Sequence, residues 1–159
     1  MIEMNAMVYY ACSYPLASGS IVCRGNWGRI LRLEAIGPST FEILLREVVF
    51  EKVRLQHYPT RPSRFDCNFV CPNRNSMEEF IKATYPNRRF DLIYEVEPVD
   101  PNAPRFETDW SLVRALQNLS LDQAEDLAHQ YWQGTSTKNV NPQNLEVLFA
   151  SDIRILRRV

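Results

Sequence analysis

Apolar side chains recur at helical spacing between residues 41 and 53. They are Phe41, Leu44, Leu45, Val48, Val49 and Val53, and charged residues fill the other side: Glu42, Arg46, Glu47, Glu51 and Arg54. This periodicity predicts an amphipathic helix. Ser39 and Glu42 have the S-x-x-E spacing of a capping box at its start, and the step from Tyr58 to Pro59 ends it.

Shorter patterns predict the other elements. Alternation and β-favouring composition predict strands over residues 7–14, 67–71, 91–99, 145–150 and 152–156, the last two meeting at a tight turn near Ser151. Capping residues predict helices from Ser76 to about Tyr85, from Asp109 to Leu116 and from Ser120 to Trp132. Strands at both ends with helices between them indicate an α+β fold rather than a βαβ repeat.

The composition is that of one globular domain. The 159 residues are 45% hydrophobic and 23% charged, and no repeat or long linker divides them. The net charge of −1 favours neither bulk nucleic-acid binding nor attraction to a membrane surface. No apolar run approaches the roughly 20 residues that span a bilayer, and residues 1–10 lack the basic residue of a secretory leader. We therefore expect a cytoplasmic protein without a membrane partner.

The cysteines give no pattern of a zinc site. Their spacing lacks the paired C-x2-C form, and few histidines are available to assist: the residues are Cys12, Cys23, Cys67, Cys71, His57 and His129. Two disulfides are arithmetically possible, but buried free thiols in a reducing compartment fit the composition better. We expect no metal site.

Glu146 stands alone as a charge inside the apolar run from Leu145 to Ala150. A buried carboxylate is costly unless it has a partner or a task. One interpretation is an alternating strand with Glu146, Leu148 and Ala150 in solvent. The other is a catalytic carboxylate that holds a sugar hydroxyl and stabilises positive charge developing on an anomeric carbon. Both interpretations remain open.

Residues 19–29 hold three of the five glycines together with Arg24 and Arg29. Backbone N–H groups exposed by glycines and a guanidinium suit a pyrophosphate, although a structural turn with solvated arginines explains the same residues. Trp27 is either a stacking platform or a loop anchor. Two prolines make the turn that leads through Pro62-Ser63-Arg64 rigid, so Ser63 and Arg64 are held at the edge of the next strand.

Taken in order, these pieces resemble the ADP-ribosyltransferase-like superfamily, and within it a group of small bacterial and phage proteins. The corresponding pieces are Tyr9-Tyr10, Gly19 to Arg29, Pro62-Ser63-Arg64, Leu92 to Glu97, Tyr131-Trp132-x-Gly134 and Glu146-Val147-Leu148. The resemblance covers most of the chain. It implies an α+β domain with a split, mixed β-sheet, flanking helices and a cleft that binds NAD as a substrate.

The resemblance also implies roles for individual residues. Glu146 would hold the ribose hydroxyl and promote loss of nicotinamide, with Tyr10 as a second catalytic residue. Ser63 and Arg64 would position the dinucleotide. The other dinucleotide contacts would be Arg24 or Arg29 at the phosphates, Tyr94 or Trp132 against the nicotinamide, and Tyr9, Asn26 and Trp27.

Two positions depart from the superfamily's pattern. Tyr10 stands where many relatives have histidine or arginine, so it can donate a hydrogen bond but supplies no charge. Asn144 stands where protein-modifying members often have glutamate or glutamine, which disfavours modification of arginine in proteins. The expected activity is ADP-ribose transfer from NAD to an unidentified protein, nucleic acid or small molecule, or NAD hydrolysis. Such a toxin or effector would have a target and a cognate inhibitor.

Two alternatives belong to other functional classes. One is a non-catalytic binding or inhibitor module of the same fold, which Tyr10 favours. The other is a nucleic-acid-binding protein that uses arginines with aromatic residues between them: Arg24, Arg29, Arg61, Arg64, Arg88 and Arg89. NAD turnover that needs Glu146 separates the enzyme from the first alternative, and salt-dependent oligonucleotide binding identifies the second.

Overall fold

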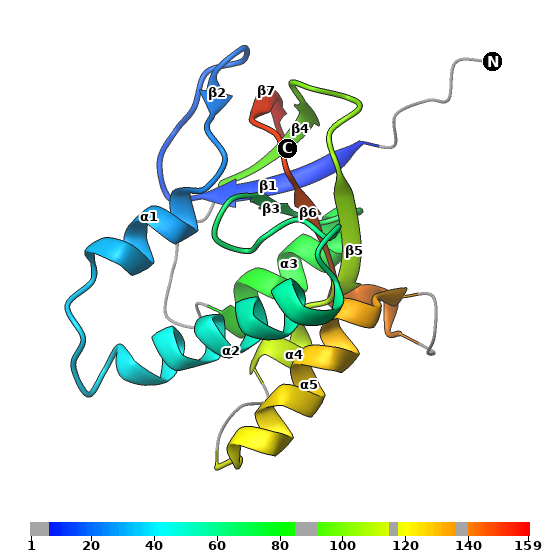
Figure 1. Cartoon of the computed structure of the whole chain (residues 1–159). Coiled ribbons are helices and arrows are strands. Elements are labelled where there is room, and N and C mark those ends of the chain that lie inside the picture. Colours follow the sequence, from blue (N-terminus) through cyan, green and yellow to red (C-terminus); the bar gives the residue numbers. More distant parts are fainter. Residues whose placement is uncertain (1–6, 85–91, 115–117, 136–139) are drawn as a thin grey trace.

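The computed structural model describes residues 7–84, 92–114, 118–135 and 140–159, which form two β-sheets and a set of helices (Figure 1). The strands are β1 (Val8–Cys12), β2 (Ile21–Val22), β3 (Asn68–Val70), β4 (Leu92–Pro98), β5 (Arg105–Asp109), β6 (Leu145–Phe149) and β7 (Ile153–Arg158). The helices are α1 (Asn26–Leu33), α2 (Phe41–His57), α3 (Arg74–Thr84), α4 (Ser111–Arg114), α5 (Leu121–Gln133) and the 3₁₀ helix η2 (Pro142–Asn144).

The strands separate into a four-stranded sheet in the order β1-β4-β7-β2 and a three-stranded sheet in the order β3-β6-β5. Every pairing between these described strands is antiparallel. The α+β class and the division into two sheets are therefore confirmed, whereas the expectation of mixed pairing is wrong. The two C-terminal strands do turn near Ser151, but β6 and β7 join different sheets instead of pairing with each other.

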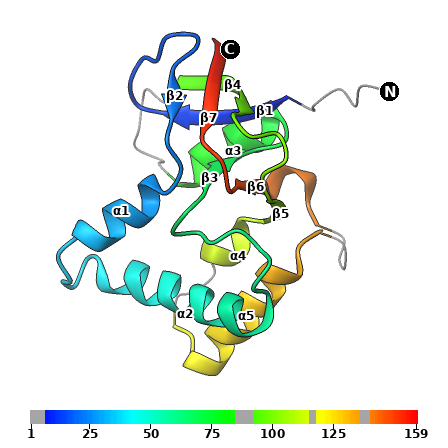
Figure 2. The same ribbon diagram turned by 45° about the horizontal axis from the view of Figure 1, so that its top comes forward.

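Alternation along β6 makes the three-stranded sheet the middle layer of the molecule. Val147 and Phe149 point to the four-stranded sheet and pack in what we call the intersheet core: Val8, Val70, Tyr94, Val96, Val147, Phe149, Ile153 and Ile155. Leu148 points to the helices and packs in the helix-side core: Val49, Phe50, Val53, Cys67, Phe106, Val113, Ala128, Tyr131, Trp132 and Leu148. Figure 2 shows α2 and α5 on the side away from the four-stranded sheet.

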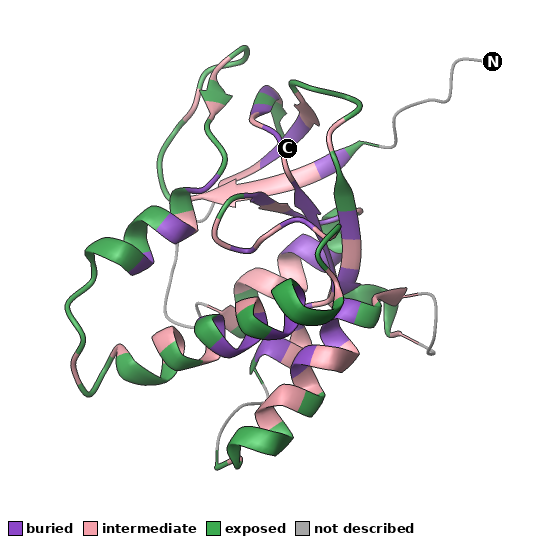
Figure 3. Ribbon diagram, viewed as in Figure 1, coloured by how far each residue is buried: buried purple, intermediate pink, exposed green. Residues whose placement is uncertain are grey.

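Helix α2 has the predicted length but presents a different side to the core. Its buried residues are Glu47, Val49, Phe50, Val53 and Arg54, whereas Phe41, Leu45 and Val48 are exposed (Figure 3). The predicted facing is correct for Val49 and Val53 but wrong for the exposed apolar residues, because α2 buries charged side chains that have partners. The predicted capping box is also wrong. Thr40 is the N-cap, and its hydroxyl donates to the carbonyl of Ala35 instead of capping the helix.

The other predicted helices are located within a few residues of their expected positions. Helix α3 begins two residues early because Asn73, not Ser76, caps it: Asn73 Oδ1 accepts a hydrogen bond from the Ser76 backbone at 2.8 Å. Asp109 accepts from the backbone N–H of Ser111 at the start of α4, and the predicted Ser120–Gln123 capping box opens α5. The expected helix ends at Tyr85 and Leu116 lie outside the described residues, as do Arg88 and Arg89.

Four elements of the described chain were not predicted, namely β2, α1, β5 and η2. Glycines concealed α1, because Gly28 lies inside it. A Cβ atom at Gly28 would lie 2.1 Å from the carbonyl oxygen of Phe65, so the helix can approach the 59–66 loop this closely only without a side chain there. The polar composition of residues 105–109 and the prolines that precede them concealed β5.

The cysteines are free thiols. Cys67 and Cys71 are buried as expected, whereas Cys12 is half-buried and Cys23 is exposed. None of the helices in the described ranges is long and apolar enough to cross a membrane.

Candidate functional site

Glu146 lies on the helix-facing side of β6 and is only 4% exposed. The interpretation that Glu146 and Leu148 face solvent is therefore wrong, because helices cover this face of the sheet. The Tyr131 hydroxyl donates to Oε1 of Glu146 at 2.7 Å, and Nη1 of Arg64 donates to the same oxygen at 3.1 Å. Among the described residues, Oε2 has no hydrogen-bond partner. One carboxylate oxygen is thus fixed and the other is available to a ligand.

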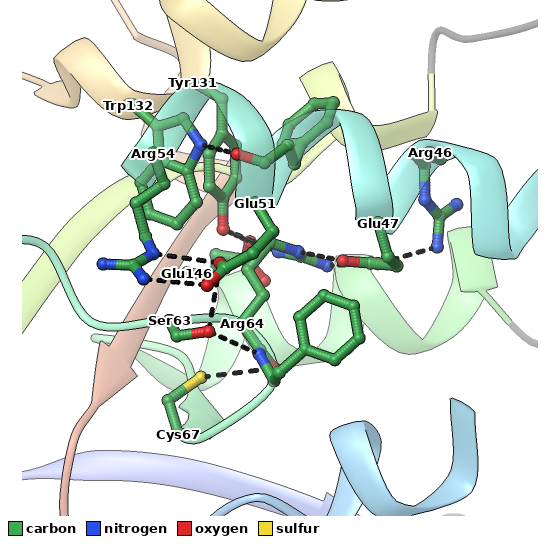
Figure 4. A network of polar contacts seen from close by, with 12 residues as sticks. Arg46, Glu47, Glu51, Arg54, Ser63, Arg64, Cys67, Tyr131, Trp132 and Glu146 are labelled. Atoms are coloured by element: carbon green, nitrogen blue, oxygen red, sulfur yellow. Dashed lines mark hydrogen bonds and ion pairs between the residues drawn. The ribbon is translucent and has the colours of Figure 1, made fainter. Parts of the chain in front are cut away.

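Arg64 joins two buried carboxylates (Figure 4). Its Nε and Nη2 atoms donate to Oε2 and Oε1 of Glu47 at 2.8 and 3.1 Å, a bidentate arrangement. Its Nη1 atom donates to Tyr131 Oη at 2.6 Å as well as to Glu146. The guanidinium also lies 4.8 Å from the centroid of the Phe69 ring. Arg64 therefore connects α2, α5 and β6 at one point.

Hydrogen bonds from helix α2 hold in place the 59–66 loop, which carries Arg64. Nη1 of Arg54 donates to the backbone carbonyl of Arg61 at 3.0 Å, while two nitrogens of Arg54 bind the carboxylate of Glu51. Glu51 in turn accepts a hydrogen bond from the Ser63 hydroxyl at 3.0 Å. Ser63 Oγ also accepts from the backbone N–H of Phe65 at 3.1 Å. These bonds give a structural reason for the rigidity that the two prolines predicted.

The two buried glutamates have opposite electrostatic environments. Burial raises the pKa of Glu47, but Arg64 and Arg46 outweigh it, so the pKa of this carboxyl lies below its ordinary value. Burial also raises the pKa of Glu146, and there Arg64 and Tyr131 offset it only in part, so the pKa stays above its ordinary value. Burial lowers the pKa of Arg64, yet Glu47, Tyr131 and Glu146 together raise it well above its usual range. Perturbed carboxyl groups of this kind concentrate at functional sites.

Glu146 and Arg64 line a cavity of about 530 Å³, a size typical of small-molecule sites. Five aromatic residues contribute to its walls: Tyr10, Trp27, Phe69, Phe80 and Trp110. Arg46, Arg64 and Arg114 supply positive charge, and Glu146 is the one carboxylate among the described residues that line it. The cavity combines planar surfaces, cations and a single anion.

Buried polar atoms without partners gather at this cavity. Within the described parts of the chain, the buried side-chain atoms that lack a hydrogen-bond partner are Trp27 Nε1, Arg46 Nε, Thr84 Oγ1 and Trp110 Nε1. All four belong to residues that line the cavity. Trp27 also lies close enough to Glu47 to help lower the pKa of that carboxyl. Since an unpaired buried polar group costs stability, the atoms of Arg46, Thr84 and Trp110 indicate a place where a ligand forms hydrogen bonds.

A family model with the description "Protein of unknown function (DUF2441)" matches residues 29–159. The chain belongs to the DUF2441 family. The matched region contains Glu47, Arg64, Tyr131 and Glu146, and it leaves out Tyr10, Asn26 and Trp27. A search of curated proteins found no match.

In this DUF2441 protein, five of the predicted site residues line the same cavity, the one described above: Tyr10, Asn26, Trp27, Arg64 and Glu146. They come from β1, α1, the loop before β3, and β6. Trp27, predicted to be either a stacking platform or an anchor, is half-buried in the cavity wall. The sequence therefore identified residues that the fold does bring together.

The predicted polar residues Arg24, Arg29 and Ser63 do not line this cavity. Arg24 lies 3.4 Å from Asp66 and donates to the carbonyl of Ala150 at 2.8 Å. Arg29 donates to the carbonyl of Arg24 at 3.0 Å, so these arginines hold the glycine-rich turn, as the structural interpretation of that stretch predicted. Ser63 instead joins the loop to α2.

Three predicted aromatic contacts are also absent from the cavity lining. Tyr94 and Trp132 are 1% and 0% exposed, so neither presents a ring to a ligand there. Trp132 donates from its indole N–H to the carbonyl of Phe50 at 2.8 Å, which ties α5 to α2. Tyr9 pairs in register with Glu95 and bridges to Cys71, and its side chain alternates away from that of Tyr10.

Sequence reasoning missed several residues of the site: Arg46, Glu47, Phe80, Thr84, Trp110 and Arg114. Tyr131 was interpreted as a core residue, which is correct for its ring but omits the role of its hydroxyl. A signal for Glu47 was present, because Phe50 and Arg54 follow it at i+3 and i+7, on the side of α2 that is buried. No local pattern indicated the others.

Proposed function

We propose that this DUF2441 protein cleaves the bond between nicotinamide and ribose in NAD and transfers ADP-ribose to an acceptor or to water. The observation that carries this proposal is the geometry of Glu146. Oε1 is fixed by Tyr131 and Arg64, while Oε2 is unpaired among the described residues, on a carboxylate that lines a donor-rich, aromatic cavity. A positioned anion of this kind favours a reaction in which positive charge develops on the substrate.

The chemistry matches that arrangement. As the bond between C1′ and the nicotinamide nitrogen breaks, nicotinamide leaves with the electron pair and loses its positive charge. The ribose ring gains that charge as an oxocarbenium-like centre, which ionised Glu146 stabilises. A nucleophilic atom of the acceptor, or a water oxygen, then forms the new bond to C1′ and releases a proton.

The surrounding residues suit a dinucleotide. Tyr10, Asn26 and Trp27 line the same cavity as Glu146, and the unpaired Nε–H group of Arg46 offers a donor to the carboxamide, hydroxyl or phosphate oxygens of the dinucleotide. Tyr10 contributes a hydrogen-bonding hydroxyl instead of a charge. Positive charge comes from Arg46, a residue the resemblance did not indicate, in place of Arg24 and Arg29.

We extend the proposal to the fold and the setting. Two separate sheets, with a glutamate on the central strand of one of them, support an ADP-ribosyltransferase-like arrangement in which all pairings between described strands are antiparallel. The free thiols support a reducing, cytoplasmic location, where NAD is available. A toxin or effector role, with a target and a cognate inhibitor, belongs to the same proposal.

Release of nicotinamide from NAD by the purified protein tests the proposal, with and without cell lysate as a source of acceptor. We expect Glu146→Gln to lower the rate about 100-fold or more, because it removes the charge and keeps the volume. Glu107→Gln is the matched control, since Glu107 lies on the neighbouring strand β5 and does not line the cavity. Equal rates for wild type and a folded Glu146→Gln variant would refute the assignment.

A non-catalytic binding module is the second candidate, and the same carboxylate favours it. Glu146 is nearly covered, and Arg64 already neutralises part of its charge. This candidate predicts binding of NAD by calorimetry without release of nicotinamide, in lysate as well as in buffer. For the nucleic-acid alternative, Arg64 is buried and Arg61 stacks over Phe106 at 4.4 Å, so these members of the arginine set do not form an open basic surface.

A further inference from the structure

The cavity has a second wall that no sequence pattern indicated. Helix α3 supplies Phe80 and Thr84, and α4 with the residue before it supplies Trp110 and Arg114. The Phe80 and Trp110 rings meet edge to face, with centroids 5.8 Å apart and an interplanar angle of 80°. The guanidinium of Arg114 lies 5.9 Å from the Phe80 centroid and 5.5 Å from that of Trp110. This wall is an aromatic platform with a cation beside it.

The same wall carries unpaired polar atoms. The indole N–H of Trp110 and the hydroxyl of Thr84 are buried and have no partner among the described residues. Trp110 Nε1 can only donate, and the Thr84 hydroxyl can donate or accept. A ligand that satisfies them must present hydrogen-bond acceptors on a flat ring. Apolar aromatic ligands lack those acceptors, and flexible aliphatic cations lack the flat ring and would be repelled by Arg114.

The second wall lies beside Glu146, and it is built from different elements than the residues suited to NAD. The backbone N–H of Trp110 donates to the carbonyl of Asn144 at 2.9 Å, and Thr108, two residues earlier, pairs in register with Glu146. Tyr10, Asn26 and Trp27 instead come from β1 and α1. A ligand on each wall would place both close to one carboxylate, which is the requirement for a transfer reaction.

We propose that the wall of Phe80, Thr84, Trp110 and Arg114 binds the nucleobase that accepts ADP-ribose. This inference rests on the proposed function, and it names the acceptor class as a nucleobase, either free in a nucleotide or within a single strand of nucleic acid. A ring nitrogen or exocyclic atom of the base forms the bond to C1′ as nicotinamide departs with the electron pair of the broken bond. The base releases one proton.

Nucleobase binding is measured without NAD, so this test does not depend on turnover. The four common ribonucleoside monophosphates and short single-stranded oligonucleotides are titrated into the full chain, with calorimetry and tryptophan fluorescence as readouts. Trp132 gives a constant background because it is fully buried, so the change reports on Trp27 and Trp110. Trp27→Phe and Trp110→Phe identify which of the two responds.

We expect Phe80→Leu to weaken binding about 10-fold and Arg114→Gln about 5-fold, the usual range for lost base stacking and a lost cation–π contact. Arg105→Gln is the matched control, because Arg105 lies 5.4 Å from the Phe149 ring in the same kind of contact but outside this cavity. Thermal unfolding of each variant reports whether it is folded.

Each outcome decides the proposal. Weaker binding in the Phe80 and Arg114 variants, with the Trp110 signal lost in Trp110→Phe, supports it. Tighter binding of oligonucleotides than of monophosphates identifies a strand as the source of the base, and the reverse identifies a free nucleotide. Binding that only Trp27→Phe weakens, or no binding of any nucleobase, overturns it. Equal release of nicotinamide by wild type and the Glu146→Gln variant would refute the proposed function and leave the base-binding result standing, because base binding is measured without NAD.

Discussion

Tyr94 and Tyr131 are both buried tyrosines, one in each core, and their hydroxyl groups are satisfied in different ways. The Tyr94 hydroxyl accepts from the backbone N–H of Leu16 at 2.8 Å and donates to the carbonyl of Tyr14 at 3.3 Å. The Tyr131 hydroxyl accepts from Arg64 and donates to Glu146. The hydroxyl group in the intersheet core is hydrogen-bonded to neutral backbone groups, whereas the hydroxyl group in the helix-side core is hydrogen-bonded to buried charged side chains.

This difference indicates where the molecule gives up stability to place charged groups beside the cavity. A buried ion pair rarely stabilises a protein more than apolar residues of similar size would, because desolvation offsets the attraction. The helix-side core nevertheless buries Glu47, Arg64 and Glu146 next to a cavity with unpaired donors. Departures from simple packing of this kind are expected at functional sites.

The largest effect should come from removing the cation that the two glutamates share. Arg64→Met leaves Glu47 and Glu146 without their main partner, and we expect a loss of about 4–5 kcal/mol in the free energy of unfolding at pH 7. Urea unfolding measures it. Arg154→Met is the comparison, because that arginine pairs with Glu97 at 2.8 Å and the two side chains are 46% and 39% exposed. The Arg154 variant should unfold at almost the wild-type midpoint, and similar losses in both variants would contradict the contrast between a buried and an exposed ion pair.

Glu47→Gln should cost somewhat less, about 3 kcal/mol at pH 7, because one neutral acceptor remains for Arg64. The pKa of Glu47 is lowered in the folded protein, so its contribution is present above the unfolded value of about 4.3 and is lost as pH falls through the lower folded pKa. The stability difference between wild type and variant should therefore shrink below about pH 4.3. Denaturant unfolding at several pH values checks this, and a constant difference down to pH 3 would contradict it.

The smallest effect compares the tyrosines directly. Tyr131→Phe removes hydrogen bonds to two charged groups, so we expect a cost of about 2 kcal/mol, against about 1 kcal/mol for Tyr94→Phe, which loses bonds to neutral backbone. Chemical denaturation of the two variants in parallel gives both values. An equal or larger loss in Tyr94→Phe would show that the charged network gains nothing from the Tyr131 hydroxyl.

The sequence predicted the site to the extent that local pattern reveals it. Glu146 was visible as a lone charge in an apolar strand. Arg64 was visible because it follows a turn that two prolines make rigid. Glu47 was assigned to the wrong side of α2 because apolar spacing alone was counted, and its partner lies 17 residues further along the chain. Only the folded arrangement shows that a carboxylate on that helix is neutralised.

The same limit applies to the fold. The α+β class and four of the helices followed from periodicity and capping residues, whereas the division into two sheets was expected only from the resemblance to a known superfamily. The pairing of β6 with β3 and β5, and of β7 with β4 and β2, did not, because strand partners are chosen by packing between distant segments. The second cavity wall depends on that pairing, so Trp110 and Arg114 carried no recognisable signal.

The placement of β6 and β7 has a consequence for how the chain acquires its structure during synthesis. β6 is the central strand of its sheet, and β7 lies between β4 and β2, so each sheet takes an inner strand from residues 145–158. Neither sheet can close until these residues have left the ribosome, although α2, α5 and the β1–β4 pair can form earlier. Pairings between such distant segments are slow to form. The assembly of Glu146 with Arg64 and Tyr131 should therefore be among the last steps of folding, and a partly synthesised chain would lack the site.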